Sequence, residues 1–226
     1  MPTSGEDGRG PKRLIVYDLD GTLVDTREDI ARAANQMRAR MGLPPLAEQE
    51  ICGTVGLGLK RLVESCLKTE DPTRVEEGTR IYRAFYAEHL LDHTALYAGV
   101  TEVLEHFRGR KQAVITNKPN PYSRQILEAL GVADYFLEIV AGDSGYAKKP
   151  DPESLLAIMR GEGAEARATV FVGDSPVDVE TGAKAGVLTV AVAQGFSDRA
   201  ELERAGPDHL VEGFPELLAL AREKSW

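Results

Sequence analysis

The chain has 226 residues, of which 42% are hydrophobic and 28% are charged, a mixture typical of a soluble globular protein with room for a core domain and a smaller second one. Lys and Arg total 27 while Asp and Glu total 36, so the formal net charge is −9. An acidic protein lacks the basic surface that nucleic acids and anionic membranes require, so we expect neither partner, and an anionic ligand must be held by a local metal ion or lysine.

The N-terminal residues 1–12 are polar and rich in glycine, which predicts a flexible tail rather than a signal peptide. No apolar run along the chain approaches the length of a membrane span. The two cysteines, Cys52 and Cys66, form no CxxC pair and have no histidine at metal-binding spacing. A disulfide between them is one alternative, but free, partly buried thiols are the preferred interpretation, and we expect a cytoplasmic protein.

The first predicted strand comprises residues 14–17, a short apolar run that ends abruptly at Asp18 and therefore resembles a buried parallel strand. No convincing strand follows between residues 27 and 93, where helical patterns are interrupted by glycine and proline. Pro72 suits the first turn of a helix that extends to about residue 91. The simplest explanation is an all-helical insertion between the first strand and the rest of a sheet.

Strands and helices alternate beyond residue 94, which predicts an α/β fold with a parallel sheet covered on both faces. The remaining predicted strands are residues 112–115, 169–172 and 188–192. The predicted helices are residues 100–108, 122–130, 152–160, 177–185 and 215–222.

Polar side chains follow three of the predicted strands. They are Asp18 and Asp20 after the first, Thr116 and Asn117 after the second, and Asp174 with Asp178 after a later one. Ligands of open parallel sheets bind outside the carboxyl ends of the strands, so these groups are expected to meet. Converging carboxylates repel one another unless a cation lies among them, and oxygen ligands favour Mg²⁺.

Lys149 precedes a predicted helix, from which it can reach the same edge of the sheet. A lysine, a hydroxyl and an amide are the donors that a phosphoryl group needs. The sequence offers no evident Ser-His-Asp arrangement, and its four histidines lie away from these strand ends. The remaining nucleophile is a carboxylate, which can form an acyl phosphate.

Four motifs resemble those of the haloacid dehalogenase-type phosphatases. They are residues 18–25 (DLDGTLVD), 116–119 (TNKP), 149–152 (KPDP) and 173–178 (GDSPVD), in the order and spacing of that family. The resemblance extends over residues 14–186. It implies a Rossmann-like core, residues 13–25 and 94–226, with a helical cap domain, residues 26–93, inserted after the first strand.

The resemblance also implies roles for individual residues. Asp18 would attack phosphorus and bind Mg²⁺ through its other oxygen. Asp20 would protonate the leaving alcohol, then activate the hydrolytic water, with its backbone carbonyl on the metal. Thr116 and Asn117 would bind the phosphoryl oxygens.

Three further residues complete the implied site. Lys149 would offset negative charge on Asp18 and on the phosphoryl group. Asp174 would be a metal ligand, and Asp178 would bind the metal directly or through water. Ser175 is expected to cap the following helix, a role compatible with metal binding by Asp174. Asp25 is interpreted as a helix cap or a hydrogen-bond acceptor near the hinge.

Other chemistries of the same superfamily are alternatives. Dehalogenases lack the second acid of the first motif, so Asp20 argues against them. Phosphonatases form a Schiff base with a cap lysine, for which Lys60 is the candidate, but Asp20 again disfavours that interpretation. Phosphosugar phosphatases and mutases keep both acids and differ only in the cap. A non-catalytic binding domain would need no nucleophile and acid two residues apart.

The substrate is expected to be a small phosphate ester. Residues 34–45, 114–119 and 206–208 resemble phosphoglycolate phosphatases, which favours 2-phosphoglycolate. Specificity would then come from the cap, chiefly from the loop of residues 53–60 that closes over the site. Lys60 or Arg61 is the candidate for binding the carboxylate of that substrate, and the alternative is that Lys60 is a solvated residue of the cap surface.

Overall fold

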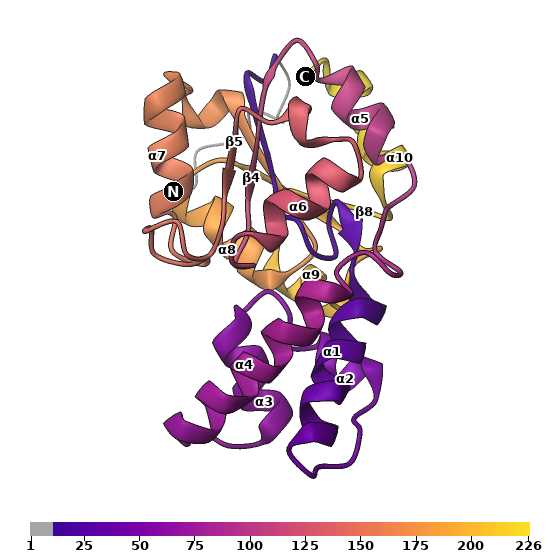
Figure 1. The fold of residues 1–226 in the computed structure, drawn as a ribbon. Coiled ribbons are helices and arrows are strands. Elements are labelled where there is room, and N and C mark those ends of the chain that lie inside the picture. The colour runs from indigo at the N-terminus through magenta and orange to yellow at the C-terminus, as the bar shows by residue number, and fades with distance from the viewer. Residues whose placement is uncertain (1–10) are drawn as a thin grey trace.

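A six-stranded parallel sheet forms the centre of the computed structural model, which describes residues 11–226 (Figure 1). The strand order is β5-β4-β1-β6-β7-β8. The bounds are β1 Leu14–Tyr17, β4 Lys111–Ile115, β5 Glu138–Val140, β6 Thr169–Gly173, β7 Leu188–Val192 and β8 His209–Val211. Because β1 lies between β4 and β6, its carboxyl end is at the middle of the edge where ligands of such sheets bind.

The two faces of the sheet are buried by different helices, as the alternation of side chains along a strand requires. Ile15 and Tyr17 of β1 belong to a hydrophobic cluster with residues of α5, α6 and α10. Leu14 and Val16 belong to a second cluster with residues of α7. Helix α8 packs on β6 and β7, and α9 packs on α8. The strands therefore read as continuous apolar runs because both faces are covered.

The helices that follow the insertion have short connections to the strands. They are α5 Val100–His106, α6 Tyr122–Ala129, α7 Glu153–Glu162, α8 Pro176–Ala185, α9 Arg199–Ala205 and α10 Phe214–Lys224. Two 3₁₀ turns, Ala133–Tyr135 and Ala166–Ala168, precede β5 and β6.

Four helices form a separate layer, which lies below the sheet in Figure 1 and which we call the cap. They are α1 Arg27–Arg40, α2 Glu48–Cys52, α3 Leu59–Leu67 and α4 Pro72–Glu88. Helix α1 packs against α4 and α2, and α3 packs against α4. The chain enters and leaves this layer through two antiparallel strands, β2 Val24–Asp25 and β3 Ala95–Leu96. This pair of strands connects the two layers.

The predicted α/β class, with a parallel-sheet core and helices inserted after the first strand, is confirmed. Strands β5 and β8 and helix α9 were not predicted. The two strands have only three residues each and lie at the edges of the sheet, so their sequences carry little apolar patterning. The helix that begins at Pro72 ends at Glu88, three residues before the predicted end.

The predicted flexible tail falls largely outside the described residues, but Lys12 does not behave as part of a tail. Its side chain is buried, and the ammonium donates to the carbonyl oxygen of Arg167 at 2.8 Å. Neither Cys52 nor Cys66 forms a disulfide, as predicted. Within residues 11–226, no helix combines the length and the apolar character needed to cross a membrane.

Candidate active site

The carboxyl ends of β1 and β6 bring three aspartates together. Asp18 follows β1, Asp174 follows β6, and Asp178 lies in the first turn of α8. All three are buried, and each offers an oxygen within 4.8 Å of the others. These are three of the residues that the sequence predicted to meet at this edge. The arrangement follows from the parallel pairing of β1 with β6, which aligns their ends.

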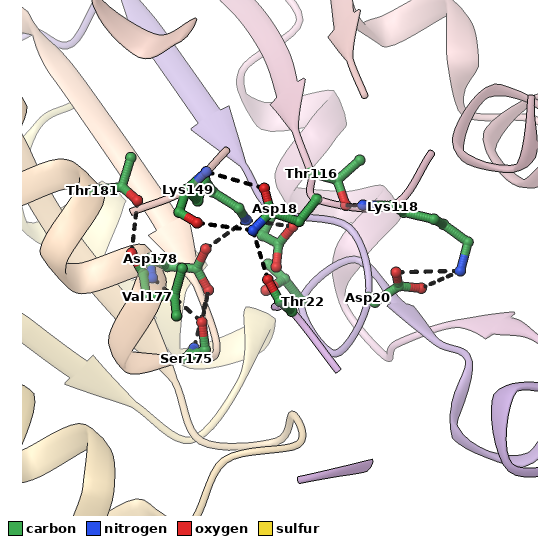
Figure 2. Close-up of polar contacts among 12 residues, drawn as sticks. Asp18, Asp20, Thr22, Thr116, Lys118, Lys149, Ser175, Val177, Asp178 and Thr181 are labelled. Atoms are coloured by element: carbon green, nitrogen blue, oxygen red, sulfur yellow. Dashed lines mark hydrogen bonds and ion pairs between the residues drawn. The ribbon is translucent and has the colours of Figure 1, made fainter. Parts of the chain in front are cut away.

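Lys149 joins two of these carboxylates (Figure 2). Its Nζ atom lies 2.7 Å from Oδ1 of Asp18 and 2.7 Å from Oδ1 of Asp178. Burial disfavours the charged amine, but the adjacent carboxylates of Asp178 and Asp18 outweigh it and raise the pKa of Lys149. The amine therefore stays an ammonium ion at neutral pH.

One ammonium is too little for three buried carboxylates. Burial, and secondarily repulsion from Asp178, raises the pKa of Asp174 to about 7. Burial also raises the pKa of Asp18, with Lys149 opposing this effect and Asp178 and Asp174 adding to it. Carboxylates held this way favour a bound cation. Because the atoms available to coordinate a metal ion are all carboxylate oxygens, the cluster fits a hard divalent ion such as Mg²⁺ or Mn²⁺.

The loop after β1 leaves space for Asp174. Gly21 has a φ of +80°, and a Cβ atom there would lie 2.2 Å from Oδ2 of Asp174. Any other residue would be strained and would displace that carboxylate. Thr22 donates from its hydroxyl to Oδ1 of Asp174 at 2.8 Å, and the Phe196 amide donates to Oδ2 at 2.8 Å. The backbone after β1 thus positions a side chain that follows β6.

Asp178 has two structural tasks. It forms a capping box with Ser175, the N-cap of α8, as predicted for Ser175. Its Oδ2 accepts from the amide and hydroxyl of Ser175, while its Oδ1 accepts from Lys149. Both oxygens therefore have protein donors, and in this structure Asp178 orients the lysine.

Asp20 points away from this cluster, toward Lys118 (Figure 2). Its Oδ1 accepts from the Thr26 hydroxyl at 2.7 Å and from Nζ of Lys118 at 2.9 Å. The sequence placed Asp20 beside Asp18 but gave no indication of these two partners. Asp25 is not the cap of α1, whose N-cap residue is Thr26. It is a hydrogen-bond acceptor, the second predicted interpretation, and accepts from the backbone amide of Arg27 at 3.2 Å.

Thr116 and Asn117 follow β4 at the same edge. The side-chain amide of Asn117 donates to the carbonyl oxygens of Gly56 at 2.7 Å and Lys149 at 3.0 Å. Its Oδ1 accepts from the backbone amide of Lys149 at 3.0 Å. The Asn117 side chain thus ties the cap loop to the segment that carries Lys149. Both polar groups of the Asn117 side chain therefore already have partners within the protein.

A cavity of about 40 Å³ lies between the core and the cap. Its core side is formed by Asp18, Asp20, Thr116, Asn117 and Lys118. Its cap side is mainly apolar and includes residues of the predicted closing loop. A second cavity, of about 50 Å³, lies on the side of Asp174 and Ser175. The carboxylate of Asp18 borders both.

Lys60 and Arg61 do not line the first cavity, contrary to their predicted role. The Lys60 side chain is 77% exposed and its amine lies 3.6 Å from Glu64, whose carboxylate also pairs with Arg61. Both residues lie on α3, and their side chains point to solvent because the apolar side of this helix packs against α4. The proposed Schiff-base lysine of a phosphonatase is therefore outside the cavity.

Comparisons with known proteins agree with this geometry. The family described as haloacid dehalogenase-like hydrolase matches residues 15–192. The chain belongs to this family. A phosphoglycolate phosphatase of Chromobacterium violaceum is 37% identical over 217 residues, covering 93% of this chain and 96% of the relative. A phosphoglycolate phosphatase of Haemophilus influenzae is 33% identical and covers 92% and 97% of the two chains.

The fold matches solved structures of the same family. A crystal structure described as a predicted phosphoglycolate phosphatase from Haemophilus somnus superposes with a TM-score of 0.88. It is 28% identical in sequence, and the match covers 93% of this chain and 98% of the other. The chain is accordingly a haloacid dehalogenase-type phosphoric monoester hydrolase. The predicted family and enzyme class are confirmed.

Proposed function

We propose that this enzyme hydrolyses 2-phosphoglycolate through an aspartyl phosphate on Asp18, with Mg²⁺ as its cofactor. The observation that carries the chemistry is the position of Asp18, a buried carboxylate that borders the cavity and lies 2.7 Å from the Lys149 ammonium. The substrate is supported by the names of the relatives, which match this chain over nearly its whole length.

The size of the cavity also supports a small substrate. One water molecule needs roughly 10–15 Å³ of such space, so the 40 Å³ cavity accepts a leaving group of only a few heavy atoms. The glycolate half of 2-phosphoglycolate is of that size. A hexose is not, unless the cap opens.

In the first half of the proposed reaction, a carboxylate oxygen of Asp18 attacks phosphorus and the ester P–O bond breaks. Asp20 gives its proton to the leaving alkoxide, which departs as the alcohol. Lys149 stabilises the negative charge that gathers around the phosphoryl group, and the Thr116 hydroxyl and the backbone at Asn117 bind its oxygens. The product of this half is the phosphorylated Asp18.

In the second half, water attacks the same phosphorus and the bond from phosphorus to Asp18 breaks. Asp20, now a carboxylate, accepts the proton of that water, and inorganic phosphate leaves. Each residue has then returned to its starting state. Apolar cap residues above the cavity exclude other water molecules, which protects the acyl phosphate until the alcohol has gone.

Asp18, Asp174 and the backbone carbonyl of Asp20 would hold Mg²⁺, with Asp178 as a direct ligand or one that acts through water. When bound, the ion would, together with the Lys149 ammonium, balance the charge of the three carboxylates and lower the cost of bringing a phosphate dianion among them. The raised pKa values of Asp18 and Asp174 support this assignment, since both indicate a site short of positive charge.

A cytoplasmic location is part of the proposal. It is supported by Cys52 and Cys66, which are both buried in the cap and both free thiols, as is usual in a reducing compartment.

The proposal is tested by measuring kcat/KM for 2-phosphoglycolate, for hexose phosphates and for phosphonoacetaldehyde, each with Mg²⁺ and with EDTA. We expect the highest kcat/KM for 2-phosphoglycolate. Turnover should be lost in EDTA and restored when Mg²⁺ is added. A preference for a hexose phosphate would overturn the substrate, and full turnover in metal-free enzyme would overturn the cofactor.

A further inference from the structure

One buried cation near the active site has no part in the steps above. Lys118 lies two residues after Thr116, and its side chain is only 6% exposed. Among the described residues that line the 40 Å³ cavity, it is the single cationic side chain. The ammonium of Lys149 is committed to Asp18 and Asp178, so it serves the phosphoryl group rather than the rest of the substrate.

The partners of Lys118 come from both layers of the protein. Its Nζ atom lies 2.9 Å and 3.2 Å from the two oxygens of Asp20, and it donates to the Tyr86 hydroxyl of α4 at 2.7 Å. An ammonium group has three N–H donors. One bond to Asp20 and one to Tyr86 leave the third donor for a ligand, which would replace the longer contact with Asp20.

The surroundings make this position selective. The cap side of the cavity carries the apolar side chains of Ile30, Leu59 and Leu62 beside uncharged hydroxyl residues, and it has no charged group among the described lining residues (Thr54, Tyr82 and Tyr86 bear the hydroxyls). An anion moved from water into such a place is strongly disfavoured unless a cation meets it. An uncharged leaving group needs no such partner. The side chain that decides between the two is therefore Lys118.

We infer that Lys118 is the specificity-determining residue for the leaving half of the substrate, where its ammonium binds a carboxylate attached to the alcohol carbon chain. The inference rests on the proposed function and extends it to a substrate class, the phosphate esters of small hydroxy acids. It assigns to a core lysine the role that the sequence suggested for Lys60 or Arg61. Lys118 also contacts Asp20, the proposed acid. A substrate whose carboxylate is bound by Lys118 would therefore have its leaving-group oxygen close to Asp20.

A different role for Lys118 makes a different prediction. If the lysine only positions Asp20, its loss slows every alkyl ester by the same factor. If it binds a substrate carboxylate, its loss slows esters that carry this group more than esters that do not. The ratio of two kcat/KM values within one variant separates these roles, because an effect on Asp20 cancels from the ratio.

The experiment compares 2-phosphoglycolate with carbamoylmethyl phosphate, in which an amide replaces the carboxylate. A second pair, 2-phospholactate and its amide, repeats the comparison on another hydroxy acid. The variants are Lys118→Met, which keeps the length of the side chain without its charge, and Lys118→Arg, which keeps the charge. Lys60→Met is the matched control, because it makes the same change at the exposed lysine of α3. Lys118→Gln replaces Lys118→Met if circular dichroism finds that variant unfolded.

We expect the wild-type enzyme to prefer the acid over the amide, and Lys118→Met to lower this preference about 10- to 100-fold, the value of a buried charge-assisted hydrogen bond. Lys118→Arg should keep part of it, and Lys60→Met all of it. An equal loss on acid and amide in Lys118→Met would overturn the inference and leave the proposed function standing. A wild-type enzyme without preference for acids would overturn it too. A Lys118-dependent preference for acids, with 2-phospholactate the better substrate, would support the inference and overturn 2-phosphoglycolate.

Discussion

Two buried lysines serve two aspartates that are only two residues apart in the sequence. Lys149 pairs with Asp18 and has all its polar partners within the core. Lys118 pairs with Asp20 and shares its ammonium with Tyr86 of the cap. In the proposed mechanism, the ammonium that serves the phosphoryl group is therefore held by the core alone, whereas the ammonium beside the leaving group is held by both layers.

The largest expected effect is the loss of activity when the nucleophile in the core is removed. Asp18→Asn removes the nucleophile while keeping the shape of the side chain, so kcat should fall by roughly 10³-fold or more on every substrate. Steady-state assays of phosphate release measure this. Asp134→Asn, at an exposed position, is the matched control and should match the wild type. Turnover above a hundredth of the wild-type rate would contradict the assignment of Asp18.

The next effect concerns Asp20, the partner of Lys118. Asp20→Asn leaves Asp18 able to attack but removes the acid and base, so turnover of alkyl phosphates should fall about 10²- to 10⁴-fold. Release of p-nitrophenolate needs no proton, so formation of the phosphoenzyme from p-nitrophenyl phosphate should suffer much less. Stopped-flow absorbance separates this first step from steady-state turnover. Equal losses in the first step for alkyl and aryl esters would argue against an acid at this position.

A third test uses the excess negative charge of the carboxylate cluster formed by Asp18, Asp174 and Asp178. The pKa of Asp174 is raised to about 7, above its ordinary value of 3.8, so the folded protein holds a proton that the unfolded chain releases. Stability of the metal-free protein should then fall as pH rises from about 4 through 7, by several degrees in Tm. Mg²⁺ should raise Tm more at pH 8 than at pH 5, because it binds the carboxylate form. Thermal unfolding of wild type and Asp174→Asn, with EDTA and with Mg²⁺, tests this, and an equal pH dependence in the two proteins would contradict it.

The smallest effect is expected where the cap meets Lys118. Tyr86→Phe removes one hydrogen-bond acceptor of the ammonium and leaves the ring in place, so kcat/KM for 2-phosphoglycolate should fall about 2- to 10-fold. Initial-rate assays measure this change. Tyr135→Phe, at a half-buried tyrosine whose hydroxyl donates to Glu105 instead, is the control and should have no effect. A loss in Tyr86→Phe as large as that in Asp20→Asn would mean that the cap contributes to the chemistry itself.

The same contrast explains what could be predicted from the sequence. Asp18, Asp174 and Lys149 were predicted to meet because each follows a strand or precedes a helix at one edge of a parallel sheet, and topology alone brings such positions together. The fold class followed from the alternation of strands and helices. The edge strands β5 and β8 were not predicted because three residues are too few to show a periodic pattern of apolar side chains.

The surroundings of the leaving group could not be predicted in this way. Lys118 meets Asp20, 98 residues away, because β4 pairs with β1, but it meets Tyr86, 32 residues away, because the cap packs against this edge of the sheet. No local pattern specifies that packing. The only signal was the place of Lys118 in the TNKP motif, next to two predicted phosphoryl-binding residues. Lys60 was preferred because it follows a glycine-flanked loop, but its position on the solvent face of α3 was not evident from the sequence.

The central claim is that Asp18 carries the phosphoryl group, and trapping that group tests it most directly. Asp20→Asn is mixed with p-nitrophenyl phosphate and Mg²⁺, quenched in acid within the first turnover, and its peptides are examined by mass spectrometry. Because this variant can form the acyl phosphate but lacks the base that hydrolyses it, we expect the mass of one phosphoryl group on the peptide containing Asp18, lost on treatment with hydroxylamine. Rapid release of p-nitrophenolate with no phosphorylated peptide, or with the phosphoryl group on another residue, would contradict the account.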